Sequence, residues 1–448
     1  MFFPHSPDHQ RRNGAMRLMR GAEILSGLLG LSIVLGVGTC AQAQSLTLLG
    51  KLPGHSVSEA YDVSDDGRVV VGWSGTGTTA LAFRWTSSGG MQNLGTLTGF
   101  GWSKAYGVSA DGRVIVGVST NANGQRRACL WLPSFNNPAI YFAYDLGTLG
   151  GAESEAWAVS ADGSVIVGVS TNTSGRRRAC LWKYSIRGFN DETGQPAVRV
   201  DLRLDLGTLA GYTDASEARG VSADGGVVVG FSSLSTRSRA CRWIIRNNAV
   251  QRVDDLGTLG GDSSVAYDIS DDGGTVVGGA ADSSGWLHAF IHQGSMRVLG
   301  SSSTVAYAVA EYGEVIVGTA VPGRQSRALR WTSGGQEDLN ATYASLLPQG
   351  SLLRDAHGIS RNGRYIVGSI GPDSATGGID QAFLLDTARC STHRGDINRD
   401  GCVDDNDLLI VLFNFGRSGT GLGREDVNCD GNVDDADLLI VLFNFGQC

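Results

Sequence analysis

The sequence predicts an all-β chain with a seven-bladed β-propeller of four strands per blade, followed by a small α-helical calcium-binding module. Two observations carry this prediction. A hairpin pattern recurs seven times between residues 44 and 388, and an acidic 12-residue loop occurs twice between residues 389 and 448. A single four-stranded sheet cannot bury both of its faces, whereas a ring of such sheets can.

The first 43 residues have the features of a signal peptide. Met16–Arg20 is positively charged, Ile24–Val37 is apolar, and Ala41-Gln42-Ala43 matches a small-residue cleavage site. Met16 is an alternative start. The apolar stretch is short for a membrane span, so we expect no transmembrane span in the mature chain. The mature protein is therefore expected to be secreted, extracellular or at the cell surface, where disulfides can form.

The seven hairpins share one pattern. Each begins with Ala and ends with Gly 12 residues later, as in Ala60–Gly72 and Ala105–Gly117. The central turn is Asp-Gly in five copies, and such pairs favour the positive φ angles of hairpin turns. Small residues at both ends of every hairpin indicate crowded backbone positions. The remaining copies begin at Ala156, Ala218, Ala266, Ala306 and Ala356.

Each hairpin is followed by a third strand, such as Ala82–Trp85, and in six copies by a fourth, such as Asp145–Leu149. The last repeat lacks a fourth strand, and Ser45–Gly50 is an unassigned strand of that kind. We therefore expect the N-terminus to close the ring. The alternative is a β-solenoid, for which repeats of 40 to 62 residues are long. The recurring Leu-Gly-Thr-Leu, Ala-Tyr-x-Val-Ser, Val-Val-Gly and Ala-Phe-x-Trp segments resemble the HAF-type extracellular repeat family, which implies secretion and a repeat scaffold.

The two acidic loops, Asp396–Asp407 and Asp426–Asp437, each lead into the same Leu-Leu-Ile-Val-Leu-Phe-Asn-Phe-Gly segment. Oxygen-bearing side chains occupy positions 1, 3, 5, 9 and 12, and Gly401 and Gly431 occupy position 6. This spacing suits calcium, which takes six to eight oxygen ligands, and the glycine allows the sharp bend of the loop. No helix is expected before either loop. We expect Leu408, Leu409, Leu412, Phe415 and their copies Leu438, Leu439, Leu442 and Phe445 to pack two antiparallel helices.

This duplicated loop and helix resembles the type I dockerin module. The resemblance implies two Ca²⁺ ions as cofactors and a cohesin-like or cell-surface partner. It implies ligation of the first ion by Asp396, Asn398, Asp400, the Cys402 carbonyl, Asp404 (directly or through water) and Asp407. It implies ligation of the second by Asp426, Asn428, Asp430, the Asn432 carbonyl, Asp434 and Asp437. Loop positions 10 and 11, which dockerins use to bind cohesins and which are often Ser-Thr, are here Asp405-Asn406 and Asp435-Ala436.

Eight cysteines are present. Cys129, Cys180 and Cys241 occupy the slot held by Phe83, Phe290 and Phe383 in other repeats, so they are expected to be separate buried thiols. Four more lie in the calcium module and allow three full connectivities. If the helices run antiparallel, the chain end lies beside the first loop, and Cys402 would pair with Cys448.

Charge and motifs exclude several classes of function. The formal charge is -8, no basic stripe suggests nucleic acid, and no metalloprotease or hydrolase motif occurs. Before the third-strand alanine, five repeats carry a basic residue that could form a ring for an anionic ligand. The competing interpretation pairs these residues with Glu59, Glu155, Glu217 or Asp355. The five are Arg127, Arg178, Arg239, His288 and Arg327.

We therefore expect a secreted, non-catalytic binding or cell-surface protein, with an interaction face on the propeller and a docking or anchoring calcium module. One alternative is a component of extracellular polysaccharide degradation, because dockerins are often attached to glycoside hydrolases. A polysaccharide could then be substrate or ligand, although no pair of catalytic carboxylates is evident from the sequence. The other alternative is a purely structural surface protein.

Overall fold

A computed structural model describes residues 44–77, 79–97, 101–320, 326–373, 380–387, 395–397, 403–418, 422, 425–428 and 432–446. The expected signal peptide lies outside this part of the chain, as do Asn398, Asp400, Cys402 and Asp430 of the acidic loops. Cys390, Cys429 and Cys448 also lie outside it. Within the described residues, no helix has the length and apolar character needed to cross a membrane.

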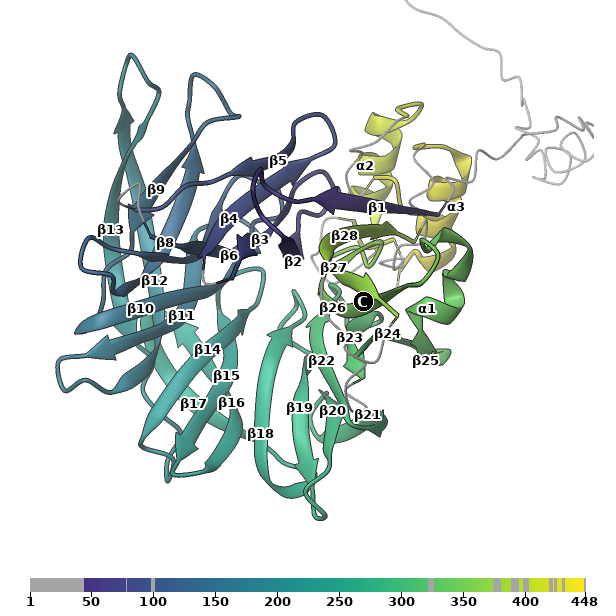
Figure 1. Cartoon of the computed structure of the whole chain (residues 1–448). Coiled ribbons are helices and arrows are strands. Elements are labelled where there is room, and N and C mark those ends of the chain that lie inside the picture. The colour runs from purple at the N-terminus through teal and green to yellow at the C-terminus, as the bar shows by residue number, and fades with distance from the viewer. Residues whose placement is uncertain are drawn as a thin grey trace, which may run out of the picture. The chain divides into compact units, whose positions relative to one another are not determined.

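Every repeat forms antiparallel strands in chain order (Figure 1). The first strands are β2 (Val57–Val63), β6 (Ser103–Val108), β10 (Gly150–Val159), β14 (Ala215–Val221), β18 (Gly260–Ile269), β22 (Thr304–Val309) and β26 (Ser351–Ile359). The second strands are β3 (Val70–Thr76), β7 (Ile115–Thr120), β11 (Val165–Asn172), β15 (Val227–Leu234), β19 (Val276–Asp282), β23 (Ile316–Ala320) and β27 (Tyr365–Pro372).

The outer strands complete these sheets. The third strands are β4 (Thr79–Thr86), β8 (Arg126–Pro133), β12 (Arg177–Phe189), β16 (Arg237–Arg246), β20 (Leu287–His292), β24 (Arg327–Thr332) and β28 (Gln381–Asp386). The fourth strands are β5 (Gly90–Asn93), β9 (Tyr141–Asp145), β13 (Pro196–Asp205), β17 (Ala249–Gly257), β21 (Met296–Ser302) and β25 (Gly335–Asp338). The expected fourth strand Asp145–Leu149 is therefore misplaced. β9 ends at Asp145, and Gly147, at φ +79°, turns the chain toward the next repeat.

These strands form five four-stranded sheets and one eight-stranded sheet. The eight-stranded sheet joins the fourth and fifth repeats through a single parallel bridge, Ser238 to Ser263. After β25 come a short helix, α1 (Leu339–Thr342), and a 3₁₀ turn, Ala344–Leu346. The chain is thus mostly β, and each sequence repeat corresponds to one four-stranded group.

The N-terminal strand β1 (Ser45–Gly50) pairs with β28 of the last repeat, so the expected closure is confirmed. The strand order of this sheet is β1-β28-β27-β26, and Figure 1 shows β1 beside β28. Because β1 is the fourth strand of the last repeat, the two ends of the repeat region share one sheet. An edge of β28 that would otherwise be open is covered.

The Ala and Gly of each hairpin face one another across the first two strands. Ala60 pairs with Gly72, for example, and a Cβ added to Gly72 would lie 2.0 Å from the Glu59 carbonyl oxygen. The expected crowding is confirmed, because this contact is 1.9 or 2.0 Å in all seven repeats. Immediately after the alanine, the register shifts in every repeat, as in a β-bulge. A bulge redirects the side chain of the extra residue.

Five of the seven hairpin turns have a Ser-x-Asp-Gly pattern. In the first repeat, Ser64 Oγ donates to Asp66 Oδ1, which also accepts from the Arg68 N–H. Gly67 has φ +69°, and the equivalent glycines of the other repeats lie between +69° and +77°. The glycine therefore supplies the positive φ, while the aspartate fixes the turn by side-chain hydrogen bonds.

A hydroxyl bridges successive repeats at six junctions. The third-strand alanine N–H of one repeat donates to the hydroxyl that lies two residues before the first-strand alanine of the next, at 2.9–3.1 Å. Ala382 of the last repeat donates to Ser58 of the first in this way. The repeats therefore follow one another in a closed circle.

Buried residues between successive sheets form the core. One cluster combines Val114 and Leu130 of the second repeat with Val159 and Trp182 of the third. Cys129, Cys180 and Cys241 are free, fully buried thiols, as expected, and burial raises the pKa of each. They act as small apolar core residues.

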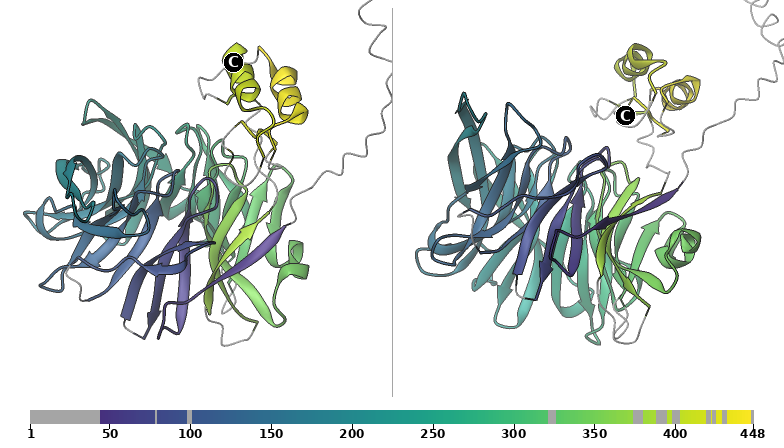
Figure 2. Two further views of the ribbon diagram at one scale, coloured as in Figure 1. Left: turned by 90° about the horizontal axis from the view of Figure 1, so that it is seen from above. Right: turned by 45° about the horizontal axis from the view of Figure 1, so that its top comes forward.

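The C-terminal module contains two helices, α2 (Asp405–Asn414) and α3 (Asp435–Asn444), which lie beside one another (Figure 2). The expected packing residues are partly wrong. Leu409, Leu412 and Phe415 are about half exposed, as are their copies Leu439, Leu442 and Phe445. Two fully buried valines, Val411 and Val441, fill the interface instead, with Ile397, Val403, Val427 and Val433. Each helix is too short to bury the wider apolar face that the sequence presents.

Candidate functional site

The bulged residue after each first-strand alanine lines a common cavity. Five of the seven are aromatic, and the other two carry cationic groups. Because the bulge occurs at the same place in every repeat, the seven side chains are brought to one level of the circle. They are Tyr61, Tyr106, Trp157, Arg219, Tyr267, Tyr307 and His357, and we call them the axial ring.

Six of the seven neighbouring pairs in the axial ring make ring–ring or cation–ring contacts. Tyr106 stacks on Trp157 with ring centroids 4.4 Å apart, and Arg219 lies over Trp157 at 4.0 Å. His357 closes the series, because its ring lies 5.2 Å from Tyr307 and 5.0 Å from Tyr61. Burial raises the pKa of the Tyr61, Tyr106 and Tyr307 hydroxyls, so these rings stay neutral.

The cavity inside the axial ring has a volume of about 300 Å³. At its hairpin-turn end, Arg361 of the last repeat forms ion pairs with Asp65 of the first and Asp271 of the fifth. One guanidinium thus links three repeats. A volume of this size is at the lower end of the range for small-molecule sites, so it would accommodate a small ligand or one end of a larger ligand.

Two carboxyl groups also line the cavity, Asp62 and Asp268. Each accepts a hydrogen bond from a backbone N–H of the following repeat: Asp62 from Val108 at 2.8 Å, Asp268 from Val309 at 2.9 Å. Burial raises the pKa of Asp62 to about 6 and that of Asp268 to about 7, and the charge of Asp62 contributes to the latter. Their hydrogen bonds hold adjacent repeats together, which favours a structural role for both.

Acidic side chains two residues before the ring members differ in how they are neutralised. Glu155 pairs with Arg126 at 2.8 Å, and Glu217 pairs with Arg177 and Arg219, each at 2.8 Å. In the third and fourth repeats, the charge of each glutamate is therefore matched by one or two guanidinium groups.

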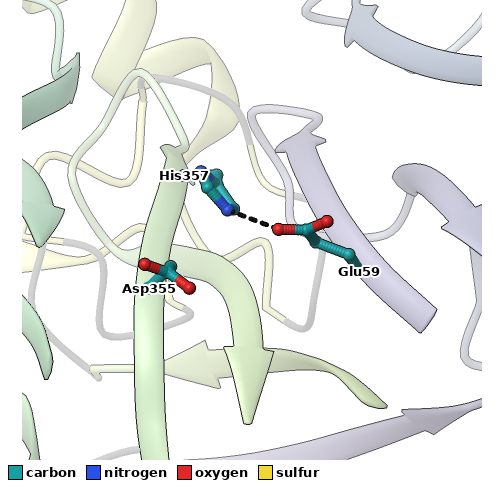
Figure 3. Close-up of side chains that lie close together, drawn as sticks. All are labelled: Glu59, Asp355 and His357. Atoms are coloured by element: carbon teal, nitrogen blue, oxygen red, sulfur yellow. Dashed lines mark hydrogen bonds and ion pairs between the residues drawn. The ribbon is translucent and has the colours of Figure 1, made fainter. Parts of the chain in front are cut away.

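At the closure of the circle, the equivalent residues Glu59 and Asp355 lie beside His357 (Figure 3). His357 Nε2 is 2.8 Å from Glu59 Oε1, and Trp73 Nε1 donates to Glu59 Oε2 at 2.9 Å. Burial lowers the pKa of His357, but the hydrogen bond and charge of Glu59, with the charge of Asp355, raise it above its usual value overall. The raised pKa favours the charged form of the imidazole beside these two carboxylates.

None of the five basic residues before the third-strand alanines lines the axial cavity. Among the described residues, no hydrogen bond or ion pair joins one of them to another. Their partners also differ from the acidic residues that the ion-pair interpretation named. Arg127 pairs with Asp145, Arg178 donates to the Asp214 carbonyl, Arg239 donates to Tyr212, His288 pairs with Asp282, and Arg327 pairs with Asp338.

The described calcium-loop residues are Asp396, Asp404, Asp407, Asp426, Asn428, Asn432, Asp434 and Asp437. Position 12 is fully buried in both copies. Asp407 accepts backbone N–H groups of Ile397 and Asp404, and Asp437 accepts those of Asn428 and Asp434. The position-12 carboxylate thus draws the start of each loop onto its helix. Carboxylate and amide oxygens are the donors that calcium takes, so the residues fit this ion.

The axial ring was missed from the sequence, although a signal was present. Five of the seven hairpins have Tyr or Trp directly after the alanine. In a regular strand, the side chain at this position would be indistinguishable from the others that alternate between the two faces of the sheet. The bulge is what directs it into the cavity. The meeting of Glu59 with His357 depends on contact between the first and last repeats, which are 298 residues apart.

No family model matches the chain, and no curated protein matches it. Solved structures with a similar fold include TolB from Acinetobacter baumannii, at 15% identity and a TM-score of 0.39. That match covers 62% of this chain and 61% of TolB, so it spans less than two thirds of that protein. The β-propeller domain of the Trilobed protease from Pyrococcus furiosus is similar over 73% of this chain and 95% of its own, at 10% identity and a TM-score of 0.47.

Oligogalacturonate lyase from Vibrio parahaemolyticus is similar over 76% of this chain and 93% of its own, at 11% identity and a TM-score of 0.46. These likenesses concern the fold alone. The chain is mostly β by its own strands, and β-propellers are among its structural neighbours.

Proposed function

We propose that this is a secreted binding protein. A seven-bladed β-propeller of the HAF-repeat type would bind ligand in its axial cavity, and a dockerin-like module holding two calcium ions would dock or anchor it. The axial ring is the observation that carries this proposal. Aromatic faces grouped around a concave site, with a few polar groups, are typical of ligand sites.

The ligand class that suits this lining is the terminal residue of a glycan. The flat aromatic rings offer apolar faces to a sugar ring, while Arg219, His357 and the tyrosine hydroxyls can bond its hydroxyl groups. The alternative of polysaccharide hydrolysis has less support, because Asp62 and Asp268 are engaged with backbone groups. The anionic-ligand ring of Arg127 and its equivalents also has less support, since these side chains have partners of their own.

The docking role of the C-terminal module is supported by its exposed apolar face. Phe413 and Phe443 are 83% and 81% exposed, and the half-exposed leucines of α2 and α3 flank them. Exposed apolar groups of this density mark interaction surfaces. Loop positions 10 and 11 differ from the Ser-Thr pair of dockerins, so the proposed partner is a cohesin-like or another cell-surface protein.

A glycan array probed with the calcium-loaded full-length protein tests the proposal. We expect binding to a limited set of glycans that share one terminal sugar. If the protein still binds the same glycans after Ca²⁺ has been removed, the binding is assigned to the propeller. An array with no binding above that of an unrelated secreted protein would contradict the glycan proposal. Release of shortened products from the bound glycans would favour the hydrolytic alternative.

A further inference from the structure

The closure of the circle brings together three side chains with the donor chemistry of a transition-metal site. One ligand atom each from Glu59, Asp355 and His357 can be chosen so that all three lie within 4.8 Å of one another. Glu59 comes from β2 of the first repeat, and Asp355 and His357 come from β26 of the last. Figure 3 shows Asp355 beside the His357–Glu59 pair.

The other repeats show how unusual this grouping is. Glu155 and Glu217 occupy the position of Glu59, and each is held by one or two arginines. Glu59 and Asp355 instead share one imidazole, and the nearby ammonium group of Lys104 lies over the Trp73 ring at 4.2 Å. The charge of Lys104 acts on Glu59, whereas no described residue forms an ion pair with Asp355, so a cation can balance the Asp355 carboxylate.

Asp355 has an oxygen available for such a cation. Its Oδ2 accepts a hydrogen bond from Ser369 Oγ at 3.1 Å, and no described residue donates to Oδ1. Glu59 and His357 are only 13% and 16% exposed, so their positions are fixed by packing. Trp73 Nε1 and Tyr61 Oη also contact Glu59, and such outer contacts orient metal ligands.

We propose that Glu59, Asp355 and His357 bind a divalent transition metal, with Zn²⁺ as the reference ion. Two carboxylate oxygens and one imidazole nitrogen suit zinc, and three protein ligands leave a coordination position for water or ligand. The metal takes the place of the proton between His357 Nε2 and Glu59 Oε1. His357 also lines the axial cavity, so the open position is next to the proposed ligand site.

The site is independent of the calcium loops, and of its three ligands only His357 also belongs to the axial ring. It would join the first repeat to the last at the place where the circle closes. Its failure would leave the axial ring and its aromatic residues unchanged, so the two proposals can be separated by experiment.

The test is zinc binding by the full-length protein saturated with Ca²⁺, measured by calorimetry and by metal analysis after dialysis. We expect one Zn²⁺ per chain that His357→Tyr and Asp355→Asn each weaken at least about tenfold. His357→Tyr places the residue of four other repeats at the ring position, so the fold should tolerate it. Unchanged melting temperatures would confirm this.

The matched control is His288→Arg. This substitution removes another histidine–carboxylate pair and introduces the arginine that four other repeats carry at the equivalent position. Zinc binding should persist in this variant. Cobalt should give visible absorption bands in the parent protein that His357→Tyr abolishes. Absence of a stoichiometric zinc site, or zinc and cobalt binding that survives in His357→Tyr, would overturn the proposal.

Discussion

The repeat region and the C-terminal module hold their acidic groups in different ways. In the repeats, buried acidic groups are matched by guanidinium groups or backbone N–H groups of neighbouring repeats, as with Glu217 and Asp62. In the module, Asp407 and Asp437 are fully buried within loops that are otherwise rich in carboxylates. Away from Glu59 and Asp355, the first region supplies its own counter-charges, whereas we propose that the second depends on calcium ions from solution.

The size of the two cores reinforces this difference. The repeats bury aromatic and aliphatic residues between every pair of neighbouring sheets, including four fully buried tryptophans, Trp131, Trp182, Trp243 and Trp331. In the described part of the module, the core has six buried aliphatic residues, with partly buried leucines and isoleucines packed against them. A core of that size does not stabilise a domain of about 60 residues without further links. Calcium should therefore control the module and leave the repeats largely unaffected.

Calcium removal should give the largest effect. We expect chelator to abolish the helical circular dichroism of α2 and α3, because uncompensated carboxylates repel one another. All nine tryptophans lie in the repeats, so tryptophan fluorescence should stay unchanged. Asp437→Ala should mimic the chelator, and Asp405→Asn, at an exposed position, should not. Helicity that persists in chelator would contradict this account.

Deletion of β1 should have the next largest effect, now on the repeats. Without residues 45–50, the edge of β28 is exposed and the first and last repeats lose their shared sheet. We expect the melting temperature to fall by about 10 °C or more, or the protein to aggregate. Leu48→Lys, at an exposed position of β1, is the control and should have little effect. A deletion variant that is as stable and monomeric as the parent would rule out closure by β1.

The third prediction is a Cys402–Cys448 disulfide in the module. Gly446 N–H donates to the Val403 carbonyl, and Gly416 N–H donates to that of Val433, both at 2.8 Å. The two halves are thus related by an internal two-fold, and Ser418 bridges Asn432 at the positions equivalent to Cys448 and Cys402. Both cysteines lie outside the described residues.

Paired strand residues lie at a Cα separation that a disulfide can span. Peptide mapping without reductant should find Cys402 linked to Cys448, and reduction should lower the stability of the calcium-loaded module by about 2–4 kcal/mol. A Cys429–Cys448 link would be incompatible with the internal two-fold.

The pH dependence of the repeats should be smaller. The raised pKa values of Asp62 and Asp268, about 6 and about 7, mean that both are more easily protonated in the folded state. Their stabilising contribution is complete below pH about 4 and is lost as the pH rises through 6 to 7. We expect the free energy of unfolding, followed by tryptophan fluorescence, to decline over that range. A protein with both Asp62→Asn and Asp268→Asn should show a smaller fall in the free energy of unfolding over this pH range. If the fall is unchanged, these two carboxyl groups are not its source.

Local patterns predicted most of the fold but not the site. Strand alternation, the Asp-Gly turns and the leftover strand at Ser45–Gly50 gave the four-stranded groups and their closure, because each depends on short stretches of sequence. The axial ring depends on a bulge and on the circle as a whole, so Tyr106 and Tyr267 had no visible connection in the sequence. The helix faces were misjudged because ten-residue helices with apolar groups on all sides do not specify which side is buried.

The axial ring as ligand site is the central claim, and affinity for the array-selected glycan tests it most directly. Trp157→Ala should weaken binding at least about tenfold, equivalent to about 1.4 kcal/mol, by removing an aromatic face from the cavity. Tyr267→Ala, on another repeat, should act similarly. Phe135→Ala removes an aromatic residue that is 70% exposed outside the cavity and should leave the affinity unchanged. Equal affinities of the parent, Trp157→Ala and Tyr267→Ala proteins would contradict the claim.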